Sequence, residues 1–308
     1  MPSRNLSRLL FACACLQALT GLAPAAGLAP EPPAVPDAHL TAPLAAPKEG
    51  DIRVAFLLAP GAEVVDFSGP WGVFDYVYVG NDNHKPFKLY TVAATKDPIV
   101  VSGGLTIVPN YSLADAPAPQ VIVVPAMDTD KLAPAALAWL RAAQPGTDLT
   151  MSVCNGSFVL GQAGLLDGRK ATAHHGGYVS LRAEFPKVEV LRGVRYVEDG
   201  KIATAGGLTS GTDLALRVVE RYFGRETAKQ TAAYLEYQGT GWMHPESNAS
   251  FAQRAVSTDA HPVCPVCEMS LSQKTDLKAE YEGKTYYFCS QWCKDHFLAN
   301  PKRYVDAK

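Results

Sequence analysis

Two groups of cysteines carry the chemistry that this sequence could perform. Cys154 stands alone, between an apolar β-branched run and the start of an apolar-periodic run, in the stretch TMSVCNGSFVLGQAGLL. A cysteine on a tight strand-to-helix turn meets backbone N–H groups and the positive end of a helix dipole, which lower its pKa and favour the nucleophilic thiolate. The alternative is a small core residue, since free cysteine is among the most buried residue types. The stretch alone leaves both interpretations open.

The other group lies near the C-terminal end of the chain, as two close pairs. Cys264 and Cys267 are separated by two residues, and Cys289 and Cys293 by three. Two such pairs on short elements can converge on one tetrahedral ion, and soft thiolates favour zinc or Cu(I) over magnesium or calcium. One or two disulfides are the alternative, which an oxidising compartment would favour. A segment this small buries little apolar surface, so we expect it to be stabilised either by a bound metal ion or by disulfides.

The elements that must hold Cys154 alternate between strands and helices. Apolar runs typical of buried strands lie at 51–60, 87–95, 121–127 and 149–153. Helices are predicted at 65–79, 132–144, 156–166 and 210–224. Glycine-containing turns predict β-hairpins at 98–110 and 194–205. This alternation predicts an α/β domain with a mainly parallel sheet covered by helices on both faces. Ligands of such sheets bind beyond the carboxyl ends of the strands, where Asp66, Met127 and Cys154 fall.

Composition limits the classes of function. The chain has 308 residues, a hydrophobic fraction of 47% and a formal net charge of -2. This length is enough for one α/β domain and a smaller unit. A mildly acidic chain without a basic stripe is a poor nucleic-acid binder, so no nucleic acid is expected as a partner.

The N-terminal segment has the layout of a secretory signal peptide. Two arginines precede a short apolar run, and small residues follow it. We therefore predict a cleaved signal peptide at 1–25 and export, most simply to a periplasm. An uncleaved membrane anchor is the alternative, although the apolar run is short for a span. Residues 26–50, rich in Ala and Pro, are predicted to form a linker.

Three segments resemble the ThiJ/PfpI family in the family's own order. They are VVDFSGPWGVFD, SVCNGSFVLGQAGLLDGRKATAHH and IATAGGLTSGTDLAL, within residues 51–240. The resemblance is to the branch of isonitrile hydratases and of the ligand domains of AraC-type regulators. It implies a flavodoxin-like fold related to class I glutamine amidotransferases, with no cofactor in this domain. Carried over to this chain, it implies that Cys154 is the nucleophile, that Asp66 is the acid bonded to it, and that His174 is a histidine near the elbow.

The resemblance also implies a pocket around the nucleophile. Its oxyanion donors would be the amides of Asn155 and of Ala126 or Met127, and Gly69 would belong to the same pocket. The family often has Gly-Gly where this chain has Ala126-Met127, which would crowd the site. Asn155 stands where isonitrile hydratases have threonine. An acid beside the thiol can donate to the thiolate when protonated, or act as general base when ionised.

The C-terminal segment resembles a YHS domain, a relative of heavy-metal TRASH modules. The match covers the PVC–EM core, YEGKTYYFCS, the Cys-x3-Cys and FLANPKRY. It implies metal-ligand roles for Cys267, Cys289 and Cys293, while Cys264 replaces a usual aspartate and would complete a four-thiolate set. We expect a small α+β module at 259–308, after a linker at 241–258.

Two functions are therefore expected from the sequence. The first is an exported cysteine-dependent enzyme of hydratase or hydrolase type that adds to a small electrophile and carries a metal module. The second is a non-catalytic metal-handling or ligand-sensing protein that uses the large domain as a scaffold. Expected partners are a small molecule, a metal ion such as zinc or Cu(I), and, as an option, a second copy of the chain.

Overall fold

The structure is a computed structural model that describes residues 41–305. The predicted signal peptide at 1–25 and most of the predicted linker at 26–50 lie outside the described residues. Among the helices within 41–305, none has the length and apolar character that a bilayer crossing requires.

A seven-stranded sheet forms the centre of the main domain. Its strand order is β10-β11-β7-β6-β1-β2-β5, and all neighbours are parallel except the hairpin of β10 and β11. The strands are β1 (Ile52–Leu57), β2 (Phe87–Ala93), β5 (Tyr111–Ser112), β6 (Val121–Val124), β7 (Leu149–Ser152), β10 (Tyr196–Asp199) and β11 (Ile202–Ala205). The predicted mainly parallel sheet is confirmed. The other predicted hairpin is also present, as β3 (Ile99–Val100) and β4 (Thr106–Ile107).

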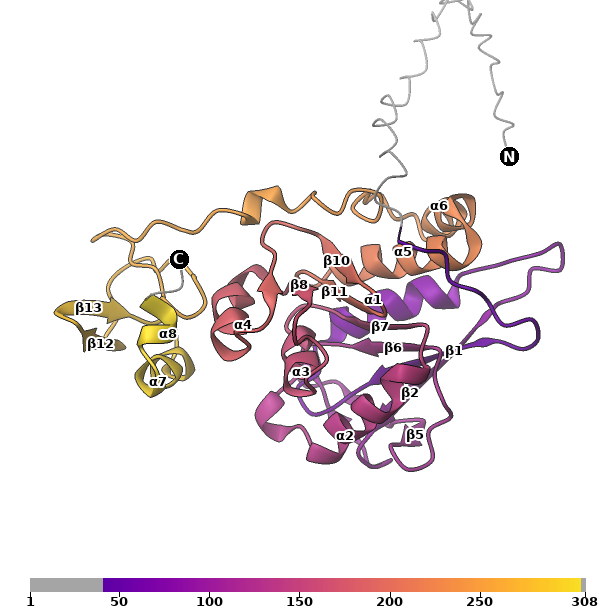
Figure 1. Cartoon of the computed structure of the whole chain (residues 1–308), viewed down its shortest axis with the longest axis horizontal. Helices are drawn as coiled ribbons and strands as arrows, with labels where there is room; N and C mark the ends of the chain where they lie inside the picture. The colour runs from indigo at the N-terminus through magenta and orange to yellow at the C-terminus, as the bar shows by residue number, and fades with distance from the viewer. Residues whose placement is uncertain (1–40, 306–308) are drawn as a thin grey trace, which may run out of the picture. The chain divides into compact units, whose positions relative to one another are not determined.

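Helices cover both faces of this sheet (Figure 1). Alternate residues of β1 show this, because Val54 and Phe56 belong to one apolar cluster while Ala55 and Leu57 belong to the other. The helices on the first face are α1 (Val64–Asp75), α5 (Ser210–Phe223) and α6 (Arg225–Tyr234). Those on the second face are α2 (Pro134–Ala143) and α3 (Gly156–Gln162). Strands β1 and β6 therefore contribute to two cores, as their continuous apolar sequences require.

A further helix, α4 (Tyr178–Glu184), lies between the short parallel strands β8 (Lys170–Ala171) and β9 (Glu189–Val190). No apolar period in the sequence predicts this helix or α6. Four of the seven residues of α4 are buried apolar residues or alanine, yet they divide between two different clusters. A helix buried on two sides shows no amphipathic pattern.

The C-terminal module is a hairpin followed by two short helices. It consists of β12 (Lys278–Tyr281), β13 (Lys284–Tyr287), α7 (Gln291–Ala299) and α8 (Lys302–Val305). Ser290 caps α7, because its hydroxyl accepts a hydrogen bond from the Cys293 amide at 3.2 Å. Phe288 and Phe297 are fully buried and form the centre of a small core. The aromatic residues Tyr286 and Tyr287 lie on β13, and α7 ends at Ala299, before Pro301.

The predicted linker at 241–258 is packed in its first half. Trp242 is 2% exposed, and its carbonyl accepts a hydrogen bond from the Tyr196 hydroxyl at 2.7 Å. Asn248 is buried, whereas every residue of 249–261 is exposed. The segment therefore continues the main domain before it becomes a tether.

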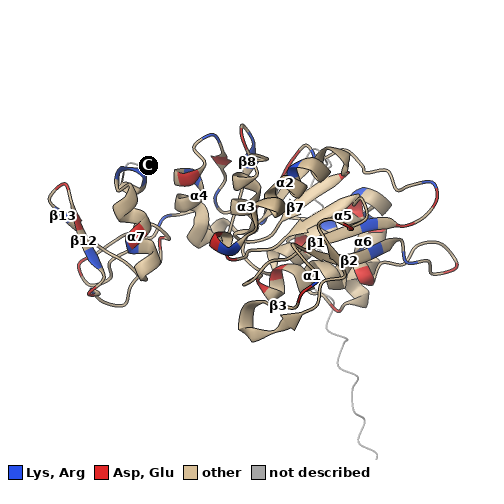
Figure 2. Cartoon of the chain, turned by 90° about the horizontal axis from the view of Figure 1, so that it is seen from below, with Lys and Arg blue, Asp and Glu red and all other residues tan. Residues whose placement is uncertain are grey.

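Along the ribbon in Figure 2, Lys and Arg alternate with Asp and Glu over most elements.

Candidate functional site

Cys154 occupies a sharp turn between β7 and α3. Its φ of 58° lies in the left-handed region, which non-glycine residues seldom adopt and which is typical of a nucleophile elbow. The Cys154 amide donates to the carbonyl of Gly206 at 2.9 Å, which ties the elbow to the end of β11. A Cβ on Gly156 would overlap the carbonyl oxygen of Val124, so the turn closes only because this residue is glycine. Local sequence and one long-range bond thus fix the thiol at the carboxyl ends of the strands.

Asp66 supplies a buried carboxyl group from α1. Its side chain has no exposed surface, and Oδ2 accepts a hydrogen bond from the Ala126 amide at 3.0 Å. The other oxygen, Oδ1, has no hydrogen-bond partner among residues 41–305. Burial raises the pKa of Asp66 to about 7, against the lowering effects of the Ala126 amide and the Cys154 thiol. Asp66 therefore changes protonation near neutral pH.

The thiol and this carboxyl influence each other. Burial, followed by the negative charge of Asp66, raises the pKa of Cys154 to about 12. The amides of Leu208 and Asn155 act in the opposite direction, because their N–H groups favour the thiolate, but they are outweighed. The lowered pKa expected from an elbow at a helix start is thus not found in the resting state. At neutral pH, Cys154 is a thiol beside a carboxyl that is partly ionised.

His174 lies at the start of the turn that leads into α4. Its Nδ1 accepts a hydrogen bond from the Gly176 amide at 3.1 Å, which leaves the proton on Nε2. Burial, with a smaller effect of His175, lowers the pKa of His174 below its usual value, so the ring is neutral at physiological pH. A Cβ on Gly207 would lie 2.7 Å from Cδ2 of this ring. His174 therefore contacts the loop that delivers the Leu208 amide to the thiol.

The predicted pocket residues have different environments. The Ala126 amide donates its hydrogen bond to Asp66. Of the two oxyanion donors predicted at Ala126 and Met127, the Met127 amide is therefore the one that remains available. Asn155 is exposed, and its amide faces the Cys154 sulfur. Gly69 lies in the contact of α1 with α5, where a Cβ would be 2.7 Å from the Thr212 hydroxyl. The structure thus gives Gly69 a packing role at this contact.

One contributor was not identified from the sequence. The Leu208 amide approaches Cys154 from the loop after β11, and Leu208 itself has a positive φ of 35°. The Gly206-Gly207 pair before α5 signals a special backbone conformation, but it does not reveal which sulfur the next amide would meet.

The second site is formed by the four C-terminal cysteines. Their sulfur atoms all lie within 4.8 Å of one another, with Cys267 to Cys289 at 3.4 Å and Cys289 to Cys293 at 3.5 Å. The five cysteines of the described chain are free thiols, so no disulfide joins these pairs. Four thiolates at about 2.3 Å from a tetrahedral zinc lie roughly 3.8 Å apart, which matches this arrangement. The donor set therefore fits one thiophilic ion, which would hold four thiolates that otherwise repel one another.

The four cysteines of this cluster come from three places in the module. Cys264 and Cys267 lie in the loop Cys264–Glu268, here called the knuckle, where the Glu268 amide donates to the Cys264 carbonyl at 2.9 Å. Cys289 follows β13, and Cys293 lies on α7. Cys264 and Cys293 are buried, whereas Cys267 and Cys289 are half-buried. An ion would therefore enter from the side of Cys267 and Cys289.

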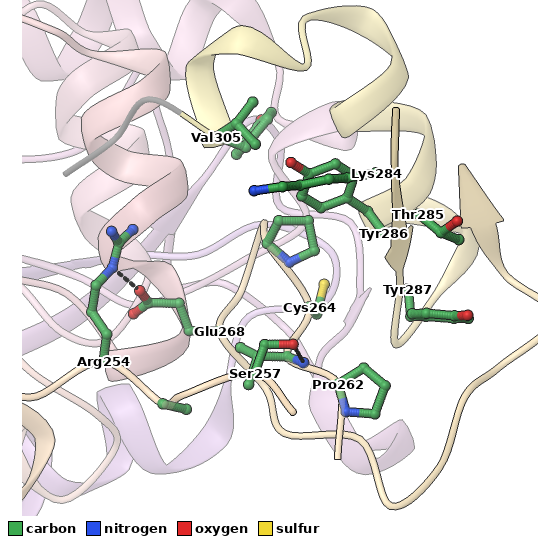
Figure 3. Close-up of a pocket in the computed structure, with 14 residues that line it drawn as sticks. Arg254, Ser257, Pro262, Cys264, Glu268, Lys284, Thr285, Tyr286, Tyr287 and Val305 are labelled. Carbon is green, nitrogen blue, oxygen red and sulfur yellow. Dashed lines mark hydrogen bonds and ion pairs between the residues drawn. The ribbon is translucent and has the colours of Figure 1, made fainter. Parts of the chain in front are cut away.

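A cavity of about 500 Å³ borders the knuckle (Figure 3). Tyr286 and Tyr287 of β13 form one wall of the cavity. The opposite wall holds an ion pair of Arg254 with Glu268, whose nitrogen and oxygen are 2.5 Å apart. Cys264 lines this cavity, but its side chain is fully buried. The cavity is thus separate from the accessible side of the thiol cluster.

Comparisons with known proteins agree with this architecture. A model described as the DJ-1/PfpI family matches residues 52–221, and a model described as the YHS domain matches residues 263–308. An isonitrile hydratase of Pseudomonas putida is 31% identical over 193 residues, which are 60% of this chain and 78% of that protein. The HTH-type transcriptional regulator CdhR of Pseudomonas aeruginosa is 27% identical over 180 residues, or 58% of this chain and 52% of the regulator.

Solved structures show the same fold. A THiJ/PfpI family protein from Pseudomonas syringae superposes with a TM-score of 0.54 at 30% identity, over 62% of this chain and 76% of that one. An AraC family transcriptional regulator from Pseudomonas putida gives a TM-score of 0.53 at 21% identity, over 60% and 99% of the two chains. Both resemblances inferred from the sequence motifs are confirmed.

Proposed function

Because this chain belongs to the DJ-1/PfpI family, and because its buried thiol lies beside a carboxyl that titrates near neutrality, we propose that it is a cysteine-dependent enzyme. Cys154 would add covalently to a small electrophilic carbon in a reaction of hydratase or hydrolase type. The observation that carries this proposal is the Asp66 carboxyl. It is buried, its Oδ1 has no hydrogen-bond partner in the described residues, and it interacts with a thiol that needs a base.

The pKa values decide how the sulfur is activated. A thiol whose pKa is about 12 is not ionised at neutral pH, whereas a carboxyl whose pKa is about 7 is about half ionised there. Asp66 would therefore take the thiol proton as the new bond to sulfur forms, rather than in a prior ionisation. The N–H groups of Asn155 and Leu208 would stabilise the negative charge that develops on sulfur.

An isonitrile is the substrate class that the similar hydratase suggests. The sulfur of Cys154 would bond to the terminal carbon, and the thiol proton would pass through Asp66 to that carbon, giving a thioimidate. Water would then add to the same carbon, with one proton going to nitrogen. Cleavage of the carbon–sulfur bond would release an N-substituted formamide and return the thiol, so the net reaction adds one water to the isonitrile.

The C-terminal module would bind one thiophilic ion, zinc or Cu(I), through Cys264, Cys267, Cys289 and Cys293. We further propose that the mature protein is exported, most simply to a periplasm, because of the N-terminal residue pattern.

Turnover of a small alkyl isonitrile by the purified full chain tests the enzyme proposal. We expect the formamide product, seen by NMR, to be absent with Cys154→Ser and to fall at least about a hundredfold with Asp66→Asn. The matched control is Asp75→Asn, which removes a half-buried acid at the end of the same helix, paired with Lys85, and should retain wild-type turnover. Absence of product with the wild type, at any metal content, would reject this substrate class.

Ligand sensing without turnover is the second candidate. It is favoured by the raised pKa of the resting thiol and by the similarity to transcriptional regulators. Reversible binding of a small molecule without consumption, unaffected by Cys154→Ser, would support it against catalysis.

A further inference from the structure

The turn His174–Gly177 is packed against the elbow of the first cysteine site. A Cβ on Gly177 would overlap Oδ1 of Asn155, the residue that follows the thiol. On the other side, the His174 ring lies against Gly207, next to the Leu208 amide. Both amides that face the Cys154 sulfur therefore belong to segments in contact with this turn.

The same turn contacts the second cysteine site. A Cβ on Gly176 would lie 3.3 Å from the carbonyl oxygen of Cys267, and equally far from Nδ1 of His174. Gly176 thus lies directly between Cys267 of the knuckle and the His174 ring, in contact with both. Larger residues at this position would push on one neighbour or the other.

Helix α4, which continues from the turn, anchors the knuckle. The Ser180 hydroxyl donates to the Val266 carbonyl at 2.9 Å, and both residues are buried. Val179 and Ala183 share an apolar cluster with Cys264 and Cys293. The knuckle and the turn are therefore joined by hydrogen bonding and by apolar packing.

Two ion pairs hold the last residue of the knuckle. Glu268 pairs with Arg192 at 2.7 Å and with Arg254 at 2.5 Å, the latter visible in Figure 3. The carboxyl is only 11% exposed, so these pairs are more than solvated surface contacts. His175 also stacks on Phe251, with ring centroids 4.5 Å apart, which attaches the turn to the same segment as Arg254.

We propose that the turn His174–Gly177 couples the two cysteine sites, so that metal binding by the C-terminal module restricts access to Cys154. With the ion bound, the knuckle is rigid and holds the turn against the elbow. Without it, the knuckle loses the ligand that orders it, because so small a core depends on its metal, and the turn moves away from Asn155 and Gly207. This coupling rests on the proposed metal binding, and it concerns access to the thiol rather than turnover.

The rate of Cys154 alkylation tests this coupling in the full chain. Zinc-loaded and chelator-stripped protein, both reduced, are treated briefly with iodoacetamide, and the Cys154 peptide is quantified by mass spectrometry apart from the C-terminal peptides. We expect Cys154 to react roughly five- to hundredfold faster in the stripped protein. The double variant Ser180→Ala and Arg192→Met should react at the fast rate even when it holds a full equivalent of zinc.

A matched variant separates coupling from general loosening. Lys187→Met removes an ion pair with Asp167, also 2.7 Å long, that does not involve the knuckle, and should leave the zinc-dependent difference unchanged. If the double variant fails to fold, the reciprocal measurement replaces it. Wild type alkylated at Cys154 while zinc protects the other thiols should, after stripping, bind zinc more weakly than the unmodified protein.

The possible outcomes are distinct. Equal alkylation rates in loaded and stripped protein, with unchanged zinc affinity after alkylation, would overturn the coupling and leave metal binding intact. Failure to take up zinc would overturn metal binding and the coupling together. The isonitrile proposal is decided by formamide formation, and neither alkylation nor zinc titration depends on it.

Discussion

The amide of Ala126 donates a hydrogen bond of 3.0 Å to Oδ2 of Asp66, and this bond orients a buried carboxyl beside the elbow thiol. Because one oxygen is fixed by the backbone, the other is left without a partner in the described structure. The backbone thus fixes one oxygen of the carboxyl, and the proposed function assigns proton transfer to the other.

The first prediction concerns the pH dependence of Cys154 alkylation. In the wild type we expect a rise with an inflection near pH 7, where Asp66 becomes a base, and a further rise toward pH 12 as the thiol itself ionises. Asp66→Asn should abolish the lower inflection and move the upper one to lower pH, because a negative neighbour has been removed. Iodoacetamide rates measured from pH 5 to 11 would show it, and an unchanged profile would exclude Asp66 from the site.

The same residue predicts how stability depends on pH. The pKa of Asp66 is about 7 in the folded chain, against an ordinary value of 3.8, so between these values the folded chain binds more protons than the unfolded one. Its contribution therefore makes the free energy of unfolding fall as pH rises from 4 to 7, by up to about 4 kcal/mol for a difference of about three in pKa.

Replacing the ionisable group should remove that dependence. Asp66→Asn is expected to be more stable than the wild type at pH 8 by roughly 2 to 4 kcal/mol, and nearly equal to it at pH 4. Denaturant unfolding of the main domain at the two pH values measures this difference. Equal destabilisation at both would mean that packing, not charge, dominates at this position.

A third prediction concerns the close approach at the elbow. Gly156→Ala should lower the free energy of unfolding by several kcal/mol, because its methyl group would overlap backbone atoms of β6 that cannot move aside. Gly72→Ala is the matched control, since a Cβ there meets nothing within 4 Å in the interior of α1. It should be neutral or stabilising by about 0.5 to 1 kcal/mol. Equal losses in the two variants would refute the steric explanation.

The fourth prediction is that the C-terminal module holds about one thiophilic ion per chain through its four thiolates. Elemental analysis of protein from its native compartment, with thiol titration in denaturant, should find stoichiometric metal and four titratable thiols besides Cys154. Cys267→Ser should lose the metal and unfold the module while leaving the main domain folded. Absence of both metal and free thiols would instead indicate the disulfides considered from the sequence.

Local patterns predicted the parts of both sites that depend on neighbouring residues. The strand-to-helix turn at Cys154 and the short cysteine spacings are local signals. By themselves they still allowed a core cysteine at Cys154 and disulfides in the C-terminal module. The family resemblance implied that Asp66 lies beside the thiol, but the net effect of the surroundings on the pKa of the thiol could not be inferred. Its raised pKa depends on burial and on a carboxyl 88 residues away in the sequence, and these effects outweigh the amides that the local turn supplies.

Long-range contacts explain the other differences. The Leu208 amide reaches the sulfur only because β11 lies beside β7 in the sheet. Helix α4 was not predicted because its apolar residues do not lie on a single face of the helix. The knuckle covers part of its surface, and the main domain covers another part. Contacts made by the folded chain, rather than propensity, decide such elements.

The packed start of the 241–258 segment has a consequence for affinity. Since Phe251 and Ala252 still contact the main domain and Arg254 pairs with Glu268 of the knuckle, the exposed connection is only the segment 253–261, and a flexible chain of that length spans at most roughly 15 to 18 Å. The knuckle is therefore held near α4 at an effective concentration in the millimolar range. Contacts too weak to join two separate proteins are then sufficient to hold the knuckle against the turn His174–Gly177. Lengthening the tether would lower this effective concentration, and so weaken the association, without changing any residue of either site.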